Sequence, residues 1–246
     1  MITRVRQYAK KEPSRDAHKL YVICEGAHDE PKYFEFFEGL SSNLSVITIP
    51  SEAGKTDPVQ LERRAMEKFD FECGCFSLDF SQGDRIWFVI DTDAWALEGK
   101  IAVLRDFCKK MNDDIFTRFT EIKPYCVWNV AQSNPCFEIW LYYHFYRSAP
   151  AIKEVDEFAS FKQFVDSKIN GGFKYESDPV RLKDAIANAE ANFGHGDNEA
   201  IALFSTELMF LGKEINNFVS VELNTSVKIY RTKKLNNGSR VTGSAI

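Results

Sequence analysis

Three carboxylates follow two apolar stretches of the sequence. Glu25 comes directly after residues 20–24, and Asp91 and Asp93 come directly after residues 86–90. Apolar runs of this length are typical of parallel strands that are buried on both faces, and ligands bind at the carboxyl ends of such strands. Asp91 and Asp93 are two residues apart, so their side chains leave an extended chain on the same side. We therefore expect Glu25, Asp91 and Asp93 to converge at one edge of a sheet.

A cluster of carboxylates requires a counter-charge, because like charges raise one another's pKa and repel. Mg²⁺ and Mn²⁺ bind one or two carboxylates and keep waters and phosphate oxygens in their other positions. The three acids therefore predict an open site for Mg²⁺ or Mn²⁺. The alternative is that acids at strand ends are only loop and capping residues, but the occurrence of two such motifs favours the metal site.

Several nearby residues are accessory candidates. Gly26 permits a sharp turn after Glu25, and His28, three residues after Glu25, is placed at the rim of the site as a candidate general acid. Glu30 and Glu138 lie at predicted helix starts, where a carboxylate either complements the helix dipole or joins the acidic site.

Phosphate contacts and other histidines are less specific. Lys32 and Lys55 are candidate contacts for a substrate phosphate. Lys55 belongs to a Gly-Lys-Thr sequence, but a P-loop requires glycine at position 49, which is Ile49, so nucleotide hydrolysis is excluded. His144 lies on an apolar helix face, and we expect a hydrogen-bonded core histidine rather than a base.

The elements that position these residues form an α/β pattern, in which β-like runs alternate with helix-like ones over the first 146 residues. This predicts a mostly parallel four-stranded sheet with helices on both faces, followed by a helical C-terminal lobe. We expect an α/β core over residues 1–150 and the lobe, packed on it, over residues 151–246. The predicted strands are 19–24, 45–49, 85–90 and 125–130. The predicted helices begin at 29 and at 133, and cover 58–69, 98–111, 156–169, 179–192 and 198–217.

The composition limits the class of protein. The chain has 246 residues, of which 44% are hydrophobic and 14% aromatic, enough for a stable core without disulfides. The six cysteines include no C-x-x-C pair, so we expect reduced core thiols rather than a zinc or redox site. The sequence contains neither an apolar run of about 18 to 20 residues nor a signal peptide, which predicts a cytoplasmic protein without a membrane segment.

The charge is unevenly distributed. The net charge is -5, while residues 1–20 carry +4 and residues 228–246 carry +5. The residues between these two ends are therefore strongly acidic. This acidic body argues against nonspecific wrapping of a duplex, because such affinity comes from Lys and Arg side chains that contact phosphates. The basic ends either contact phosphates or are simply solvated.

Three sequence blocks resemble the RloB-like family. They are Val-Ile-Cys-Glu-Gly at 22–26 with Glu-Pro-Lys-Tyr-Phe at 30–34, Val-Ile-Asp-Thr-Asp at 89–93, and Ser-Asn-Pro-Cys-Phe-Glu-Ile-Trp-Leu at 133–141. The two acidic blocks are also similar to the signatures of the Toprim fold found in topoisomerases, primases and OLD-type nucleases. The third block brings Asn134 into the accessory set.

The resemblance implies a metal-dependent nuclease of an anti-phage abortive-infection system, as in AbiL-type proteins, which acts on RNA such as tRNA or on DNA. It implies that Glu25, Asp91 and Asp93 form the catalytic and metal-binding set, with Mg²⁺ or Mn²⁺ bound. It also implies a partner ATPase, and an assembly of several copies is compatible with it. Ala94 and Trp95 stand where a further acid often follows in the Toprim pattern, so a two-metal mechanism is not assumed.

The alternative is a noncatalytic regulatory subunit that binds nucleic acid or the ATPase and holds a structural cation. Within the Toprim class, a topoisomerase requires a tyrosine-bearing domain and a primase usually brings a zinc module, so nuclease is the favoured activity. For that activity we expect Asp91 and Asp93 to hold the metal and Glu25 to orient or deprotonate the attacking water.

Overall fold

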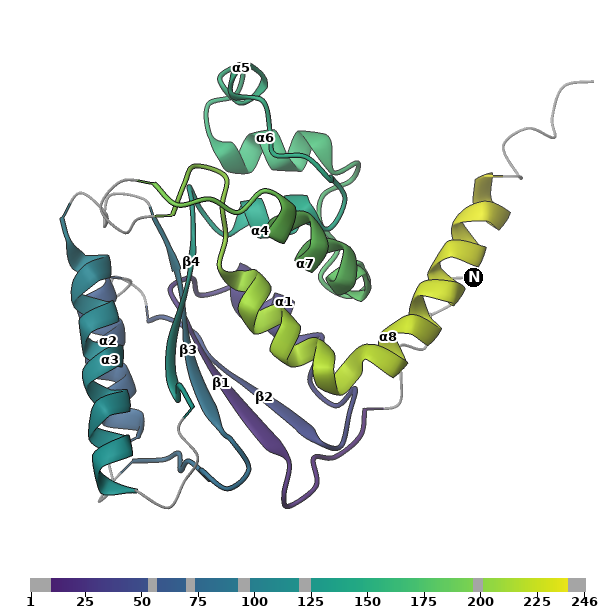
Figure 1. Ribbon diagram of the computed structural model, residues 1–246. Helices are drawn as coiled ribbons and strands as arrows, with labels where there is room; N and C mark the ends of the chain where they lie inside the picture. The colour runs from purple at the N-terminus through teal and green to yellow at the C-terminus, as the bar shows by residue number, and fades with distance from the viewer. Residues whose placement is uncertain are drawn as a thin grey trace, which may run out of the picture.

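The protein is built on a four-stranded, all-parallel sheet with the strand order β2-β1-β3-β4 (Figure 1). The computed structural model describes residues 10–52, 57–69, 74–92, 98–119, 125–196 and 201–238. The strands are β1 (His18–Cys24), β2 (Leu44–Ile49), β3 (Arg85–Asp91) and β4 (Trp128–Ser133). The predicted α/β fold class is confirmed, with β1 and β3 at the centre of the sheet.

The side chains of β1 alternate between two hydrophobic clusters, one on each face of the sheet. Leu20 and Val22 belong to the first cluster, whereas Tyr21 and Ile23 belong to the second. A strand covered on both faces has no polar side, which is why the run 20–24 is continuously apolar.

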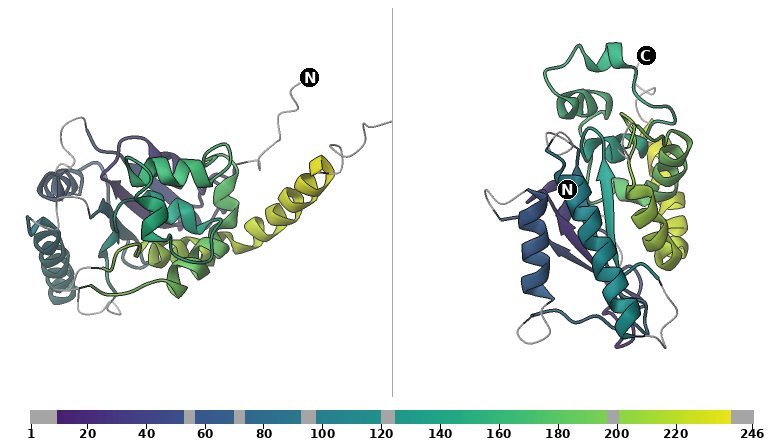
Figure 2. Two further views of the ribbon diagram at one scale, coloured as in Figure 1. Left: turned by 90° about the horizontal axis from the view of Figure 1, so that it is seen from above. Right: turned by 60° about the vertical axis from the view of Figure 1, so that its left-hand side comes forward.

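The second cluster is covered by α2 (Pro58–Lys68) and α3 (Lys100–Arg118) (Figure 2). Asp57 begins α2 because its carboxylate accepts a hydrogen bond from the backbone N–H of Val59 at 2.8 Å, and Pro58 fits the first turn. The helix α3 is longer than the predicted 98–111.

The first cluster is covered by helices from both halves of the chain. They are α1 (Asp29–Glu35), α4 (Glu138–Tyr143), α5 (Ile152–Val155), α6 (Phe161–Lys168), the short 3₁₀ helix η1 (Asp178–Arg181), α7 (Leu182–Ala191) and α8 (Leu208–Gly238). Trp140, Phe164, Leu182 and Leu211 join the same hydrophobic cluster as Val22. The helices after residue 150 therefore share one core with the sheet.

Two predicted elements are shifted. Strand β4 covers 128–133 instead of 125–130, and α4 starts at Glu138 instead of 133. Polar Ser133 continues the strand because its backbone carbonyl accepts a hydrogen bond from Thr92 at 2.8 Å and its hydroxyl bonds to the Thr206 hydroxyl at 2.8 Å.

The predicted helix 198–217 is wrong over residues 201–207. Thr206 instead forms an antiparallel bridge with Ser133 at the edge of the sheet, and α8 begins at Leu208. The predicted helix 156–169 is also shortened, to α6, after the separate turn of α5.

The cysteines and the helices bear on two further expectations. Cys24 and Cys108 are buried free thiols, as predicted, whereas the prediction of a core position is wrong for Cys75 and Cys126, which are exposed. In the described part of the chain, every helix is too short or too polar to cross a membrane.

Candidate active site at the carboxyl edge of the sheet

Glu25 and Asp91 lie together at the carboxyl edge of the two central strands. The register pairs Cys24 with Val89, so β1 and β3 end side by side. The backbone N–H of Glu25 donates to the carbonyl of Val89 at 3.0 Å, and the backbone N–H of Asp91 donates to Glu25 Oε2 at 2.8 Å. The Glu25 carboxylate is therefore held against the end of β3, beside Asp91.

The third predicted acid, Asp93, lies outside the described residues, as does Lys55. Within the described ranges, no group of three or more His, Cys, Asp or Glu side chains is arranged to hold a metal ion. Glu25 and Asp91 nevertheless supply the carboxylate oxygens that Mg²⁺ and Mn²⁺ prefer, and Mg²⁺ uses only one or two such ligands. The donor set fits such an ion in its chemistry, and the participation of Asp93 stays a prediction.

A pocket of about 220 Å³ opens beside Asp91. Its walls come from the turn after β1, the start of α1 and the start of α4. It is lined by Gly26, Ala27, His28, Asp29, Glu30, Asp91, Phe137 and Glu138. The fold thus brings Gly26, His28, Glu30 and Glu138, all predicted as accessory residues, to one acidic pocket.

Glu30 is buried in this pocket. Its Oε1 accepts a hydrogen bond from the backbone N–H of Gly26 at 3.2 Å. Burial is the main cause that raises the pKa of Glu30 to about 7. The negative charges of Glu138 and Glu25 also raise this pKa, and each of these effects is larger than the lowering by the hydrogen bond from Gly26. A Cβ atom on residue 26 would overlap the Glu30 carboxyl group, so glycine lets this carboxyl group approach the backbone without being displaced.

Lys162 supplies a positive charge at the pocket wall. Its Nζ lies 2.6 Å from Asp29 Oδ2 and 3.3 Å from Glu138 Oε1. Burial acts to raise the pKa of Asp29, but the hydrogen bond and charge of Lys162 outweigh it, and the net pKa of Asp29 is lowered. Lys162 therefore neutralises part of the acidic wall. It belongs to α6, far along the chain from both acids, and no local motif in the sequence marks it.

Cys136 lies close to these acids without being a candidate nucleophile. Burial raises the pKa of its thiol well above the usual value, and the charges of Glu138 and Asp91 raise it further. Reactive cysteines depend on the thiolate, which this environment disfavours. The chemistry of the pocket is therefore that of carboxylates.

Two predicted residues lie away from the pocket. Asn134 holds the segment before α8, because its backbone N–H donates to the carbonyl of Ser205 and its side-chain Nδ2 donates to the carbonyl of Ile201, both at 2.9 Å. Lys32 is exposed on α1 and lines a separate cavity with Glu35.

His144 is the buried histidine that was predicted. Its Nε2 lies 3.1 Å from the Tyr33 hydroxyl and its Nδ1 lies 2.9 Å from the carbonyl of Trp140. Burial lowers the pKa of His144 to about 3, so it is neutral and part of the core.

A polar network that the sequence did not reveal fixes the chain after Asp91. Thr92 donates its hydroxyl to the carbonyl of Ser133 at 2.8 Å and accepts a hydrogen bond from Gln132 Nε2 at 2.9 Å. Arg105 Nη2 donates in turn to Gln132 Oε1 at 2.9 Å. Thr92, the last described residue before Asp93, is therefore tied to β4 and to α3.

The fold and the pocket define an α/β protein with an acidic site at the carboxyl edge of a parallel sheet, where this architecture places its ligands. The model of the family described as RloB-like protein matches residues 20–215, which include both central strands and the pocket. The chain belongs to the RloB-like family. Searches of curated proteins and of solved structures gave no match.

Proposed function

We propose that this protein is a divalent-metal-dependent nuclease of an anti-phage abortive-infection system. The observation that carries the proposal is the pairing of Glu25 with Asp91, through the 2.8 Å bond from the Asp91 N–H to the Glu25 carboxylate, next to a pocket that Asp91 lines together with Glu30 and Glu138. The resemblance to Toprim nucleases supports the same activity, and the RloB-like family supports the role in defence. RNA such as tRNA is the proposed substrate, with DNA as the second choice.

Each side chain of the site has its own role in the proposed reaction. Asp91 and Asp93, with Glu25, would hold Mg²⁺ or Mn²⁺, which supplies charge neutralisation at the phosphodiester and a lowered pKa of a bound water. Glu25 orients the attacking water and accepts its proton. Glu30 and Glu138 shape the acidic wall, and Lys162 limits its charge. A partner ATPase is proposed to release the activity.

A noncatalytic subunit that binds nucleic acid or the ATPase, with a structural cation, is the second candidate. It is favoured by the lack of a three-residue ligand group among the described residues and by the ion pairs through which Lys162 already balances Asp29 and Glu138. In that case the carboxyl edge would contribute to stability, and substitution of Asp91 would leave phage resistance intact.

Cleavage of labelled tRNA, single-stranded DNA and duplex DNA tests the proposal, with purified protein in Mg²⁺ or Mn²⁺ and in EDTA. We expect cleavage of one substrate class by the wild type only in the divalent ion, and at least a hundredfold loss in Asp91→Asn, since the ligand to the metal is neutralised. Asp114→Asn, an exposed acid on α3 that lines neither this pocket nor any other described cavity, is the matched control.

Calorimetry of Mn²⁺ binding accompanies the assay. If Asp91→Asn is folded and both cleaves and binds Mn²⁺ like the wild type, the proposed site is wrong. If no substrate is cleaved even with the partner ATPase, while Mn²⁺ binds, the noncatalytic candidate is favoured.

A further inference from the structure

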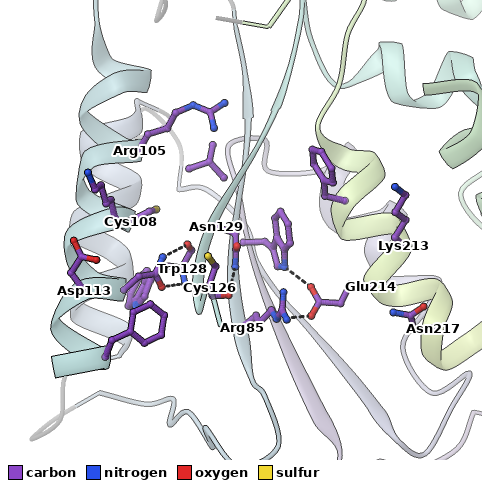
Figure 3. A pocket seen from close by; sticks show the side chains of 16 residues that line it. Arg85, Arg105, Cys108, Asp113, Cys126, Trp128, Asn129, Lys213, Glu214 and Asn217 are labelled. Carbon is purple, nitrogen blue, oxygen red and sulfur yellow. Dashed lines mark hydrogen bonds and ion pairs between the residues drawn. The ribbon is translucent and has the colours of Figure 1, made fainter. Parts of the chain in front are cut away.

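A groove of about 820 Å³ runs along β4, the edge strand of the sheet, between α3 and α8 (Figure 3). The acidic pocket shares none of its lining residues. It is lined by Arg85, Trp87, Arg105, Cys108, Lys109, Asn112, Asp113, Phe116, Cys126, Trp128, Asn129, Val130, Phe210, Lys213, Glu214 and Asn217. Its size is that of clefts that enclose an extended small ligand or a short stretch of a polymer.

The edge of β4 is already closed to another β-strand. The register with β3 directs the backbone groups of Trp128, Val130 and Gln132 outward. Asn112 on α3 bonds both the N–H and the carbonyl of Trp128 at 2.9 Å, and Glu207 bonds the N–H of Gln132 at 3.0 Å and its carbonyl at 2.8 Å. A peptide that adds to a sheet needs a row of such groups, so strand addition is blocked.

The groove is basic within an acidic protein. Its lining includes four cationic side chains and two acids, whereas the whole chain has a net charge of -5. Glu214 forms an ion pair with Arg85 Nε at 2.9 Å and accepts a hydrogen bond from Trp87 Nε1 at 2.9 Å. Two acids outside the lining pair with further cations of the groove, Glu207 with Arg105 at 2.7 Å and Glu190 with Lys213. The cationic walls face each other from two helices, with Lys109 on α3 and Lys213 on α8.

Aromatic and polar groups accompany the charges. Phe210 is 45% exposed, and Lys213 Nζ lies 5.7 Å from the centre of its ring. Trp128 is buried in the groove wall, and its indole N–H has no hydrogen-bond partner within the described part of the chain. A flat exposed ring beside lysines is the combination that stacks a base and contacts its phosphate.

The groove leads toward the acidic site. Arg105, at the end of the groove nearest the carboxyl edge, bonds Gln132, and Gln132 bonds Thr92, the residue after Asp91. A polymer that follows β4 therefore approaches Thr92, which is next to the proposed metal ligand Asp91.

We propose that this groove binds a single-stranded stretch of the nucleic-acid substrate, with its phosphates on Lys109 and Lys213 and a base on Phe210. The proposal rests on the proposed nuclease function and adds the route by which substrate reaches Asp91. A duplex keeps its bases stacked inside, so the stacking on Phe210 selects an unpaired strand.

Binding of a fluorescein-labelled single-stranded RNA, measured by anisotropy in EDTA, tests this groove without cleavage. We expect Lys109→Glu and Lys213→Glu each to weaken binding about tenfold and to reduce the dependence on salt, measured between about 50 and 200 mM, by about one counterion. Phe210→Leu should weaken binding about fivefold, because stacking is lost while apolar volume is kept. Circular dichroism verifies that each variant is folded.

Lys110→Glu is the matched control, because Lys110 is exposed on the same helix with the same charge but does not line the groove. If Lys109→Glu and Lys213→Glu bind RNA like Lys110→Glu, the proposal is wrong. It is also overturned if a poly-glutamate peptide binds in the groove and RNA does not, since the occupant is then an acidic protein segment.

Asp91→Asn separates this proposal from the nuclease function. In EDTA it should bind the RNA as the wild type does, whatever its effect on cleavage. Loss of cleavage in Asp91→Asn together with unaltered RNA binding in the groove variants would refute the groove and keep the nuclease. Groove-dependent binding without any cleavage, even with the partner ATPase, would refute the nuclease and keep the groove.

Discussion

Glu30 carries its carboxyl group in an environment that disfavours the charged form. It is buried, it faces the acids Glu25 and Glu138, and hydrogen bonds from its own backbone N–H and from that of Gly26 compensate only in part. A buried carboxyl group of this kind is not stabilised by water, so its position depends on the packing of the neighbouring side chains. The acidic pocket is therefore a source of instability in the fold at alkaline pH.

Glu30→Gln should remove this instability. The pKa of Glu30 is about 7 in the folded protein and 4.5 in an unfolded chain. The contribution of the protonated group to the free energy of unfolding is therefore complete below pH 4.5, and it is lost as the pH rises through 7. The difference of about 2.5 pH units corresponds to about 3 kcal/mol. We expect the free energy of unfolding of Glu30→Gln, measured with urea in EDTA, to fall less than that of the wild type between pH 5 and pH 8.

Glu35→Gln, an exposed acid on the same helix, serves as the control for this measurement. Parallel loss of stability in the wild type and in Glu30→Gln over this pH range would contradict the buried, protonated state of Glu30.

The sequence predicted the acids of the site better than their counter-charge. Glu25 and Asp91 follow apolar strands, and Glu30 and Glu138 begin helices, so simple rules about strand ends and helix starts place them near one another. Lys162 follows no such rule. It reaches Asp29 and Glu138 only because α6 packs beside α1 and α4, which is a tertiary arrangement without a local signal.

At the scale of elements, the segment 201–207 shows how tertiary contacts override a helical pattern. Glu207 accepts hydrogen bonds from the Gln132 N–H at 3.0 Å and from Arg105 at 2.7 Å, and its own N–H donates to the carbonyl of Gln132. These bonds satisfy backbone groups at the open edge of β4, which would otherwise lack partners. The segment therefore serves the sheet, and α8 starts only after it.

Glu207→Ala should destabilise the protein by about 1 to 3 kcal/mol, because it leaves the buried N–H of Gln132 and the guanidinium of Arg105 without this acceptor. Urea unfolding at constant pH measures the effect. Glu190→Ala is the comparison, since its ion pair with Lys213 is exposed and should contribute less than about 1 kcal/mol. Equal effects of the two substitutions would show that Glu207 is not an essential cap of the edge.

The contrast between local signals and tertiary contacts explains which elements could be predicted. The strands β1 and β3 and the helix α2 were placed correctly to within a residue or two, because continuous apolar runs and the Asp57-Pro58 start are local signals. The end of β4 is polar, and its strand geometry depends on Thr92 and Thr206, which lie 41 and 73 residues away in sequence from Ser133. Local periodicity carries no information about such partners.

On the scale of the whole molecule, the two ends of the parallel strands have different roles. The carboxyl edge, where the strands end, holds the acidic pocket. The amino edge, where they begin, is bound to α8 through Glu214. Glu214 contacts His18 of β1 at 3.2 Å, and Arg85 and Trp87 of β3 at 2.9 Å each. One side chain on α8 thereby joins both central strands, and it also fixes one wall of the groove along β4.

This fastening predicts that the docking of α8 depends on pH. Burial lowers the pKa of His18, but the hydrogen bond and charge of Glu214, the carbonyl of Gln82 and the charge of Asp84 outweigh it, and the net pKa is raised above 6.5. The contribution of His18 to stability is therefore fully present below pH 6.5 and is lost as the pH rises through the folded value.

We expect the Glu30→Gln protein to retain a loss of stability above pH 6.5 that comes from His18, and Glu214→Gln in that background to abolish it. The Glu30→Gln background is needed because Glu30 loses its own contribution in an overlapping range of pH. Urea unfolding from pH 5.5 to pH 9 measures the slope, which reports the proton taken up on folding. If the slope above pH 6.5 is the same with and without Glu214, then the pair of His18 with Glu214 is not the source of the pH dependence, and Glu214 would hold α8 through Arg85 and Trp87. A reduced slope would instead show that the attachment of α8, which forms one wall of the groove, depends on the contact between His18 and Glu214, residues that are 196 positions apart.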